Sequence, residues 1–176
     1  MTESPTYYAA FLNLRNRLCV VVGGGKVAER KIKKLLDCGA CVRVISPEVR
    51  SQVQRWAEEG QVEWVRRPYA PGDVSDAWLV FAATNDRQVN RVVWEEAEHA
   101  GKLVNVVDHP ASCTLTVPAS TRLGALQVAI STSGTDPAAA ARLRQILEQD
   151  LEHGTSRFQQ EMLNFLARDE NTTSIP

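Results

Sequence analysis

Three glycines, Gly23, Gly24 and Gly25, stand between an apolar run and a segment with helical periodicity. With the next three residues they read Gly-Gly-Gly-Lys-Val-Ala and satisfy G-x-G-x-x-A between a predicted strand and a predicted helix. Gly23 allows the tight turn, Gly25 lets a diphosphate approach the backbone, and Ala28 lets the helix pack closely on the strand. The anion would lie against N–H groups at the positive end of the helix. The motif predicts dinucleotide binding, and the alternative is a glycine-rich structural turn.

The residues after the second predicted strand bear on the choice between NAD and NADP. In an NAD enzyme, an acidic residue about 20 positions past the glycines binds the adenine ribose. Ser46 stands at that place, and Glu48 can serve if the loop curls back toward the glycines. Arg43 and Arg50 are near enough in the sequence to leave NADP open. We expect NAD, with Ser46 and Glu48 on its adenosine side.

Polar residues also follow the fourth and fifth predicted strands. Thr84 and Asn85 close the fourth strand, at the sheet edge where a nicotinamide ribose would lie, although a capped turn is the alternative. Asp108 is the carboxylate at the end of the fifth strand. Removal of a hydride from a substrate is accompanied by loss of a proton, so a carboxylate there can act as general base. Asp108 is our candidate, Asp86 and His109 are its rivals, and a helix cap or a solvated turn residue is the structural alternative.

Short apolar runs alternate with amphipathic segments over the part of the chain that carries these residues. The runs predict parallel strands at residues 18–22, 42–45, 61–65, 78–83 and 103–107. Apolar residues recur at helical spacing after the glycines, after the second strand and after the fourth strand. This alternation predicts the α/β class and a Rossmann-like doubly wound parallel sheet with right-handed crossovers.

The pattern changes after the fifth strand. Residues 114–118 and 125–132 predict two strands joined by a polar turn that contains Gly124. Asp136 can cap a helix that begins at Pro137, and a last amphipathic helix follows. This half is too small to bury itself, so we expect it to pack on the first domain or on a second subunit, which makes a homodimer the economical inference. We expect an NAD-binding domain over 1–112, a small α+β dimerisation domain over 113–153 and a C-terminal helical tail over 154–176.

Composition excludes several classes of protein. The chain has 176 residues, of which 44% are hydrophobic, and a core of this size needs no disulfides, which excludes a small disulfide scaffold. The net charge of −1 provides no field for a polyanion, so we expect no nucleic-acid partner. No apolar stretch reaches the roughly 18 residues of a membrane helix, and the first residues lack a secretory signal. We therefore expect no membrane partner and a cytoplasmic location.

Cysteine and histidine spacing gives little support to a metal site. Cys38 and Cys41 form a C-x-x-C pair, which is found in redox motifs and in halves of zinc sites. No second Cys/His pair at ligand spacing completes a tetrahedral site, and we expect Cys41 to begin a buried strand as a small apolar side chain. His99, His109 and His153 also lack a ligand spacing. We expect no resident metal.

Three segments carry a resemblance to a known family. They are VVVGGGKVAERK at residues 20–31, NVVDHP at 105–110 and AISTSGTDP at 129–137. In this order they resemble the precorrin-2 dehydrogenase/sirohydrochlorin ferrochelatase family, the family of the N-terminal module of siroheme synthase. The resemblance implies NAD-dependent oxidation of precorrin-2 to sirohydrochlorin and, in bifunctional members, insertion of Fe²⁺ to give sirohaem.

The resemblance also implies roles for individual residues. Lys26 and Val27 match the family's dinucleotide contacts after the glycines, and Pro47 and Glu48 match those after the second strand. Asp108 matches the family's essential aspartate, implicated in dehydrogenation and in chelation. The family's second domain forms an intertwined dimer, which agrees with the homodimer inferred above.

The implied substrate is a tetrapyrrole with eight carboxylates, which require local cations. Guanidinium groups pair with carboxylates in a bidentate manner. Thr132 stands where some family members carry a serine at the edge of the active site. The candidate cations are Arg15, Arg30, Lys31, Arg122, Arg142 and Arg144.

A non-catalytic NAD(H)-sensing Rossmann module is the alternative function.

Overall fold

A computed structural model describes residues 7–107, 109, 113–153 and 160–161 of the chain. The chain divides into two compact units. One unit is Ala10–Thr116, and the other takes in the residues on either side of it, described over 7–9, 117–153 and 160–161. Asp108 and most of the predicted C-terminal helical tail lie outside the described residues.

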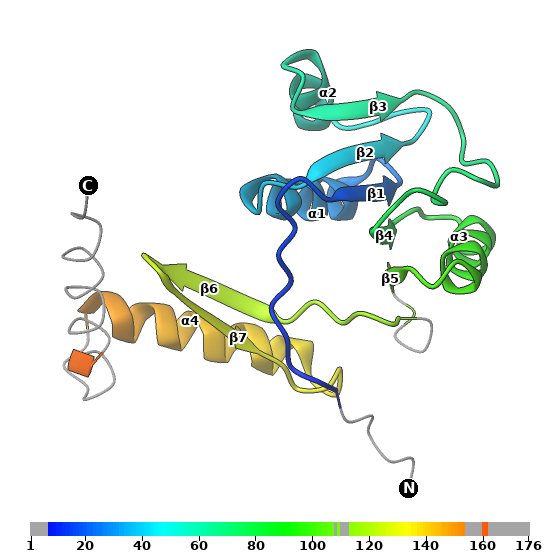
Figure 1. Cartoon of the computed structure of the whole chain (residues 1–176). Coiled ribbons are helices and arrows are strands. Elements are labelled where there is room, and N and C mark those ends of the chain that lie inside the picture. Colours follow the sequence, from blue (N-terminus) through cyan, green and yellow to red (C-terminus); the bar gives the residue numbers. More distant parts are fainter. Residues whose placement is uncertain (1–6, 108, 110–112, 154–159, 162–176) are drawn as a thin grey trace, which may run out of the picture. The chain divides into compact units, whose positions relative to one another are not determined.

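A five-stranded parallel sheet forms the centre of the first unit, with the strand order β3-β2-β1-β4-β5 (Figure 1). The strands are β1 (Leu18–Val22), β2 (Cys41–Ile45), β3 (Val62–Val65), β4 (Leu79–Ala82) and β5 (Leu103–Val106). The order reverses between β1 and β4, because the chain first adds strands on one side of β1 and then on the other. This is the Rossmann arrangement, and it confirms the predicted fold class.

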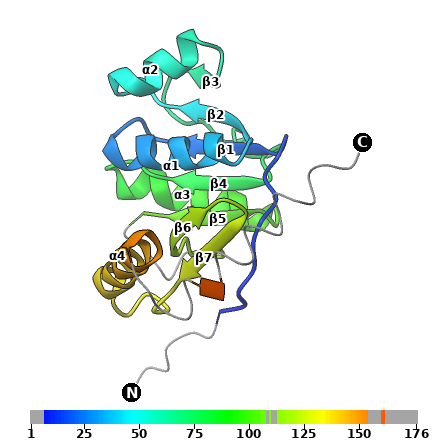
Figure 2. The ribbon, with the colours of Figure 1, turned by 90° about the vertical axis from the view of Figure 1, so that its left-hand side faces the viewer.

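Helices cover both faces of this sheet, with α1 in front of it and α3 behind it in Figure 2. The helices are α1 (Lys26–Asp37), α2 (Ser51–Glu58) and α3 (Arg87–His99). Ala28 and Ile32 of α1 pack in one core with alternate strand residues such as Val21. Val93 of α3 packs in a second core with the intervening residues such as Val20. Burial on both faces explains why β1 is a continuous apolar run rather than an alternating one.

The second unit contains an antiparallel hairpin of β6 (Ala119–Leu123) and β7 (Leu126–Ile130), followed by α4 (Pro137–His153). Gly124 lies in the hairpin turn with a φ of 56°, and the Asp136 side chain accepts a 2.7 Å hydrogen bond from the Ala139 amide. The predicted turn and the predicted helix start are therefore confirmed. Figure 1 shows α4 running along the hairpin.

The strand predicted at residues 114–118 is wrong. The amides of Thr114 and Leu115 both donate to the Val104 carbonyl, at 3.0 and 3.2 Å, and the strand itself starts at Ala119. The β-branched pattern of this segment therefore reflects packing beside β5 rather than pairing in the hairpin. The prediction that Cys41 begins a buried strand is wrong for its side chain, because Cys41 is exposed at the first position of β2.

The described part of the chain contains no helix long and apolar enough to cross a membrane.

Candidate dinucleotide site at the carboxyl edge of the sheet

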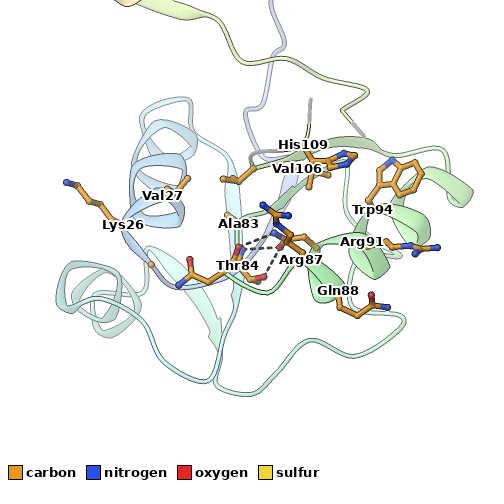
Figure 3. Close-up of a pocket in the computed structure, with 14 residues that line it drawn as sticks. Lys26, Val27, Ala83, Thr84, Arg87, Gln88, Arg91, Trp94, Val106 and His109 are labelled. Carbon is orange, nitrogen blue, oxygen red and sulfur yellow. Dashed lines mark hydrogen bonds between the residues drawn. The ribbon is translucent and has the colours of Figure 1, made fainter. Parts of the chain in front are cut away.

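A cleft of about 1200 Å³ lies where the strand order reverses, along the carboxyl ends of β1, β4 and β5. Figure 3 shows the first turn of α1 on one side of it and α3 on the other, with the Arg87 side chain extending between these walls. The loop after β4 and the end of β5 contribute the floor through Ala83, Val106 and Val107. Ligands of doubly wound sheets bind at such a reversal, beyond the carboxyl ends of the strands.

The three glycines differ in what a side chain at each position would meet. Gly23 has a φ of +119°, and a Cβ there would lie 2.4 Å from the Ala83 carbonyl oxygen. A Cβ on Gly24 would lie 2.0 Å from the Glu48 carbonyl oxygen. A Cβ on Gly25 would meet no atom within 4 Å, and Gly25 lines the cleft. Gly23 and Gly24 are therefore needed by the fold itself, whereas the space above Gly25 is available to a ligand.

The start of α1 fits a diphosphate. Its N-cap is Gly25, which provides no side-chain cap, and no side chain in the described part of the chain is seen to accept a hydrogen bond from the first-turn amides. The first amides of a helix have no partner within the helix, and they carry the positive end of its dipole. Glu29 is the acidic residue of this turn, and its carboxylate is paired with Arg50 at 2.8 Å. The open space at Gly25 and the uncapped amides together form a cradle for an anion.

Lys26 and Val27, both predicted cofactor contacts, also line the cleft. In Figure 3 the Lys26 side chain points away from the space between the two walls, so its backbone faces the cradle more directly than its ammonium does.

The loop after β2 curls back, as the prediction for Glu48 required. Ser46 is buried, and its hydroxyl donates a 2.6 Å hydrogen bond to the Glu48 carbonyl. This brings the Glu48 backbone against Gly24, while the side chains of Pro47 and Glu48 remain exposed. The Ser46 hydroxyl therefore shapes the loop, and the Glu48 side chain is exposed beside it.

The two arginines that left NADP open are engaged elsewhere. Arg43 pairs with Glu63 at 2.8 Å and with Asp76 at 3.0 Å, and these hydrogen bonds raise the pKa of its guanidinium. Arg50 pairs with Glu29. A 2′-phosphate would have to compete with these carboxylates, so the loop favours NAD.

The loop after β4 is held by a buried amide that the sequence analysis did not single out. Asn90 accepts hydrogen bonds from the Thr84 amide at 3.1 Å and from its hydroxyl at 2.8 Å, and it donates to the Thr84 carbonyl at 3.0 Å. The Thr84 side chain is thus committed to the loop, whereas Asn85 is exposed at the cleft. Asn90 was detectable as a polar residue on the same helical face as Val93 and Ala97.

Asp86 and His109 are the alternatives to Asp108 as general base, and among the residues that the structure describes His109 stays a candidate. Asp86 accepts hydrogen bonds from the amides of Gln88 and Val89, at 2.8 and 3.2 Å, and so caps α3. His109 lines the cleft beside the end of β5. Asp108, between Val107 and His109 in sequence, stays a prediction because it lies outside the described residues.

The described lining of the cleft carries cations and no carboxylate. Arg87, Arg91 and Trp94 follow one another at helical spacing on the face of α3 that borders the cleft. Arg91 is paired with Glu95 at 2.8 Å, while Arg87 has no ion pair among the described residues. Arg87 and Trp94 were not predicted from the sequence, although the spacing of 87, 91 and 94 was a signal for one helical face. An anionic ligand with an apolar body would suit this wall.

No group of three or more His, Cys, Asp or Glu among the described residues is placed to hold a metal ion.

Comparison with known proteins agrees with this geometry. Residues 10–119 match the family described as "Putative NAD(P)-binding", and residues 124–150 match the family described as "Sirohaem biosynthesis protein central". The solved structure of SirC, a precorrin-2 dehydrogenase, is similar with a TM-score of 0.73 and 32% sequence identity, over 82% of this chain and 71% of that one. The fold and the site thus define a Rossmann protein that binds NAD.

Curated relatives point to the same family. The siroheme synthase of Actinobacillus pleuropneumoniae (serotype 3, strain JL03) is 40% identical over 142 residues, which are 81% of this chain and 29% of the relative. The siroheme synthase of Methylobacillus flagellatus is 42% identical over 138 residues, which are 78% of this chain and 30% of the relative. The chain therefore spans about 30% of the length of these relatives. It belongs to the precorrin-2 dehydrogenase/sirohydrochlorin ferrochelatase family.

Proposed function

We propose that this protein catalyses the NAD-dependent oxidation of precorrin-2 to sirohydrochlorin. The observation that carries the proposal is the open space at Gly25 above the uncapped start of α1, at the strand reversal of a Rossmann sheet. Similarity to SirC over most of its length supports this substrate. In the reaction one hydride passes from precorrin-2 to NAD⁺ and one proton is released.

When bound, NAD⁺ supplies the hydride acceptor, and the chain supplies position and proton transfer. The amides that begin α1 hold the diphosphate at Gly25, and the Glu48 loop receives the adenosine side. The loop of Thr84 and Asn85, fixed by Asn90, borders the nicotinamide side. Val106 and Val107 give the floor of the cleft an apolar surface. Asp108 takes the proton that the substrate loses.

The assembly and location are part of the same proposal. The second unit has one buried side chain among those described, Ala140, while Leu143 and Ile146 of α4 are 51% and 60% exposed. We infer that a second copy of the chain covers them, so that the protein acts as a homodimer. The cytoplasm, which holds the NAD pool, is the compartment in which we expect it to act.

Replacement of Asp108 by Asn tests the mechanism. We expect D108N to lose at least about a hundredfold of turnover with precorrin-2, as removal of a general base does, and to bind NAD⁺ like the wild type. Asp37→Asn, an exposed carboxylate at the far end of α1, is the matched control and should keep full turnover. NADH absorbance measures turnover, and calorimetry measures NAD⁺ binding. Wild-type turnover in D108N would refute the role of Asp108.

A further inference from the structure

Lys31 differs in its surroundings from the other cations that the sequence offers for substrate carboxylates. Lys31 is half-buried, and its ammonium has no carboxylate partner among the residues that the structure describes. Arg144 is also half-buried, but it pairs with Glu148. The remaining candidates, Arg15, Arg30, Arg122 and Arg142, are exposed.

The two groups that contact the Lys31 ammonium are neutral. Its Nζ donates a hydrogen bond to the Asn105 side-chain oxygen at 3.2 Å and lies 5.0 Å from the centre of the Phe81 ring. The Asn105 amide is itself held by a 2.9 Å hydrogen bond to the Leu115 carbonyl. The amide oxygen therefore has a fixed direction, and it fixes the position of the ammonium.

This position lies just below the rim of the cleft. Phe81 of β4 and Asn105 of β5 are partners in the sheet, and the next residues of the two strands, Ala82 and Val106, are also partners. Ala83 and Val107, one residue further on, line the cleft. At about 3.3 Å per strand residue, the Phe81–Asn105 pair lies about 7 Å before these cleft residues, and Lys31 contacts this pair from α1.

The environment of Lys31 destabilises the charged form of its side chain. Burial, together with the nearby charges of Arg30 and Lys34 on α1, lowers the pKa of the Lys31 ammonium to about 8, while Cys113 acts in the opposite direction. Phe81 and Asn105, from the strands packed against it, bring no charge. A carboxylate arriving at Nζ would supply the missing countercharge and would raise the pKa again.

We propose that Lys31 binds one carboxylate of the tetrapyrrole and thereby holds the ring system at the ends of β4 and β5, on the α1 face of the sheet. The inference rests on the proposed function, since it takes the octacarboxylate tetrapyrrole as the ligand. Asn105 is the positioning residue in this account, because it orients the ammonium.

Variants at Lys31 separate a binding role from other roles. We expect Lys31→Met to raise the KM for precorrin-2 and the Kd of sirohydrochlorin about tenfold, the loss expected for one charge-assisted contact, with kcat within about twofold of wild type. Lys31→Arg keeps the charge and should restore most of the affinity. Lys33→Met, an exposed lysine of the same helix, is the control. Unchanged KM and Kd in K31M, or a fall in kcat alone, would overturn the proposal.

Proton uptake gives a second readout that a structural role would not produce. At pH 8 about half of Lys31 is deprotonated, so binding of sirohydrochlorin should take up roughly half a proton more in the wild type than in K31R. Calorimetry in buffers of different ionisation enthalpy measures this difference, and equal uptake in the two proteins would contradict the inference. K31M should melt no lower than the wild type, because it removes a charge that burial penalises. A lower melting temperature with unchanged affinity would indicate a structural lysine.

The two proposals fail in distinguishable ways. If the wild type does not oxidise precorrin-2 but binds sirohydrochlorin with the predicted proton uptake, the proposed function is wrong and the Lys31 contact stands. If the wild type oxidises precorrin-2 and K31M keeps the same KM, the Lys31 contact is wrong and the proposed function stands.

Discussion

At the scale of single residues, the glycine turn separates what the fold needs from what the ligand needs. A side chain at Gly24 would collide with the Glu48 backbone, whereas one at Gly25 would enter open space in the cleft. The backbone of Gly25 is extended, with a φ of −79°, so other residues can adopt it without strain. The sequence motif treats the two positions as parts of one pattern, whereas the structure surrounds Gly24 with backbone and leaves open space at Gly25.

This difference predicts that substitution of Gly25 weakens NAD⁺ binding, whereas substitution of Gly24 lowers the thermal stability. Gly25→Val should leave the melting temperature within about 3 °C of wild type and weaken NAD⁺ binding at least about tenfold, because its side chain occupies the place of the diphosphate. Gly24→Ala should lower the melting temperature, because its Cβ would lie 2.0 Å from a carbonyl oxygen. Thermal melts and calorimetry check both. Wild-type NAD⁺ affinity in G25V would place the diphosphate elsewhere.

At the scale of elements, α3 shows how a helix positions the loop before it. Asp86 caps the helix, and Asn90, one turn later, reaches back to Thr84. The buried amide therefore replaces the hydrogen bonds that the Thr84 backbone would otherwise make to water. The helix and the loop that borders the cleft behave as one unit.

Asn90→Ala tests whether the loop after β4 depends on the Asn90 amide. The substitution leaves the Thr84 amide and carbonyl without their partner, which should cost about 2 kcal/mol in the free energy of unfolding and raise the KM for NAD⁺. Glu98→Ala, at an exposed position of the same helix that does not line the cleft, is the matched control and should change neither quantity much. Denaturant unfolding and steady-state kinetics measure the two effects. An N90A protein as stable as E98A would show that the loop does not depend on the amide.

The strand and helix pattern of the first unit was predictable because both faces of its sheet are covered. Continuous apolar runs such as β1 and amphipathic segments such as α1 then give unambiguous signals. The segment at 114–118 was mispredicted because its hydrogen bonds go to Val104, and no local pattern reveals that partner. The glycine turn was likewise predictable from the sequence. Asn90 and Arg87 in the site were missed because their importance comes from the approach of α3 to the cleft.

At the scale of the whole molecule, the second unit leaves large apolar side chains exposed. The hairpin strands β6 and β7 contain no fully buried residue, and α4 presents large exposed apolar side chains. A hairpin and one helix cannot enclose a core, so association with another copy offers the missing burial.

Replacement of both Leu143 and Ile146 by Glu tests the homodimer. We expect the wild type to sediment as a dimer of its 19.5 kDa chain and the double variant to sediment as a monomer, because two charges would be buried in the interface. Gln149→Glu, an exposed position of the same helix, is the control and should remain dimeric. A wild-type protein that is monomeric at high micromolar concentration would contradict the proposed assembly.

The central claim is tested most directly by mixing the wild-type protein anaerobically with precorrin-2 and NAD⁺ and recording the absorbance spectrum. The account predicts that sirohydrochlorin and NADH appear together in a ratio of one to one. Absence of both products, in a sample that calorimetry shows to be saturated with NAD⁺, would contradict it and leave a protein that senses the dinucleotide without catalysis.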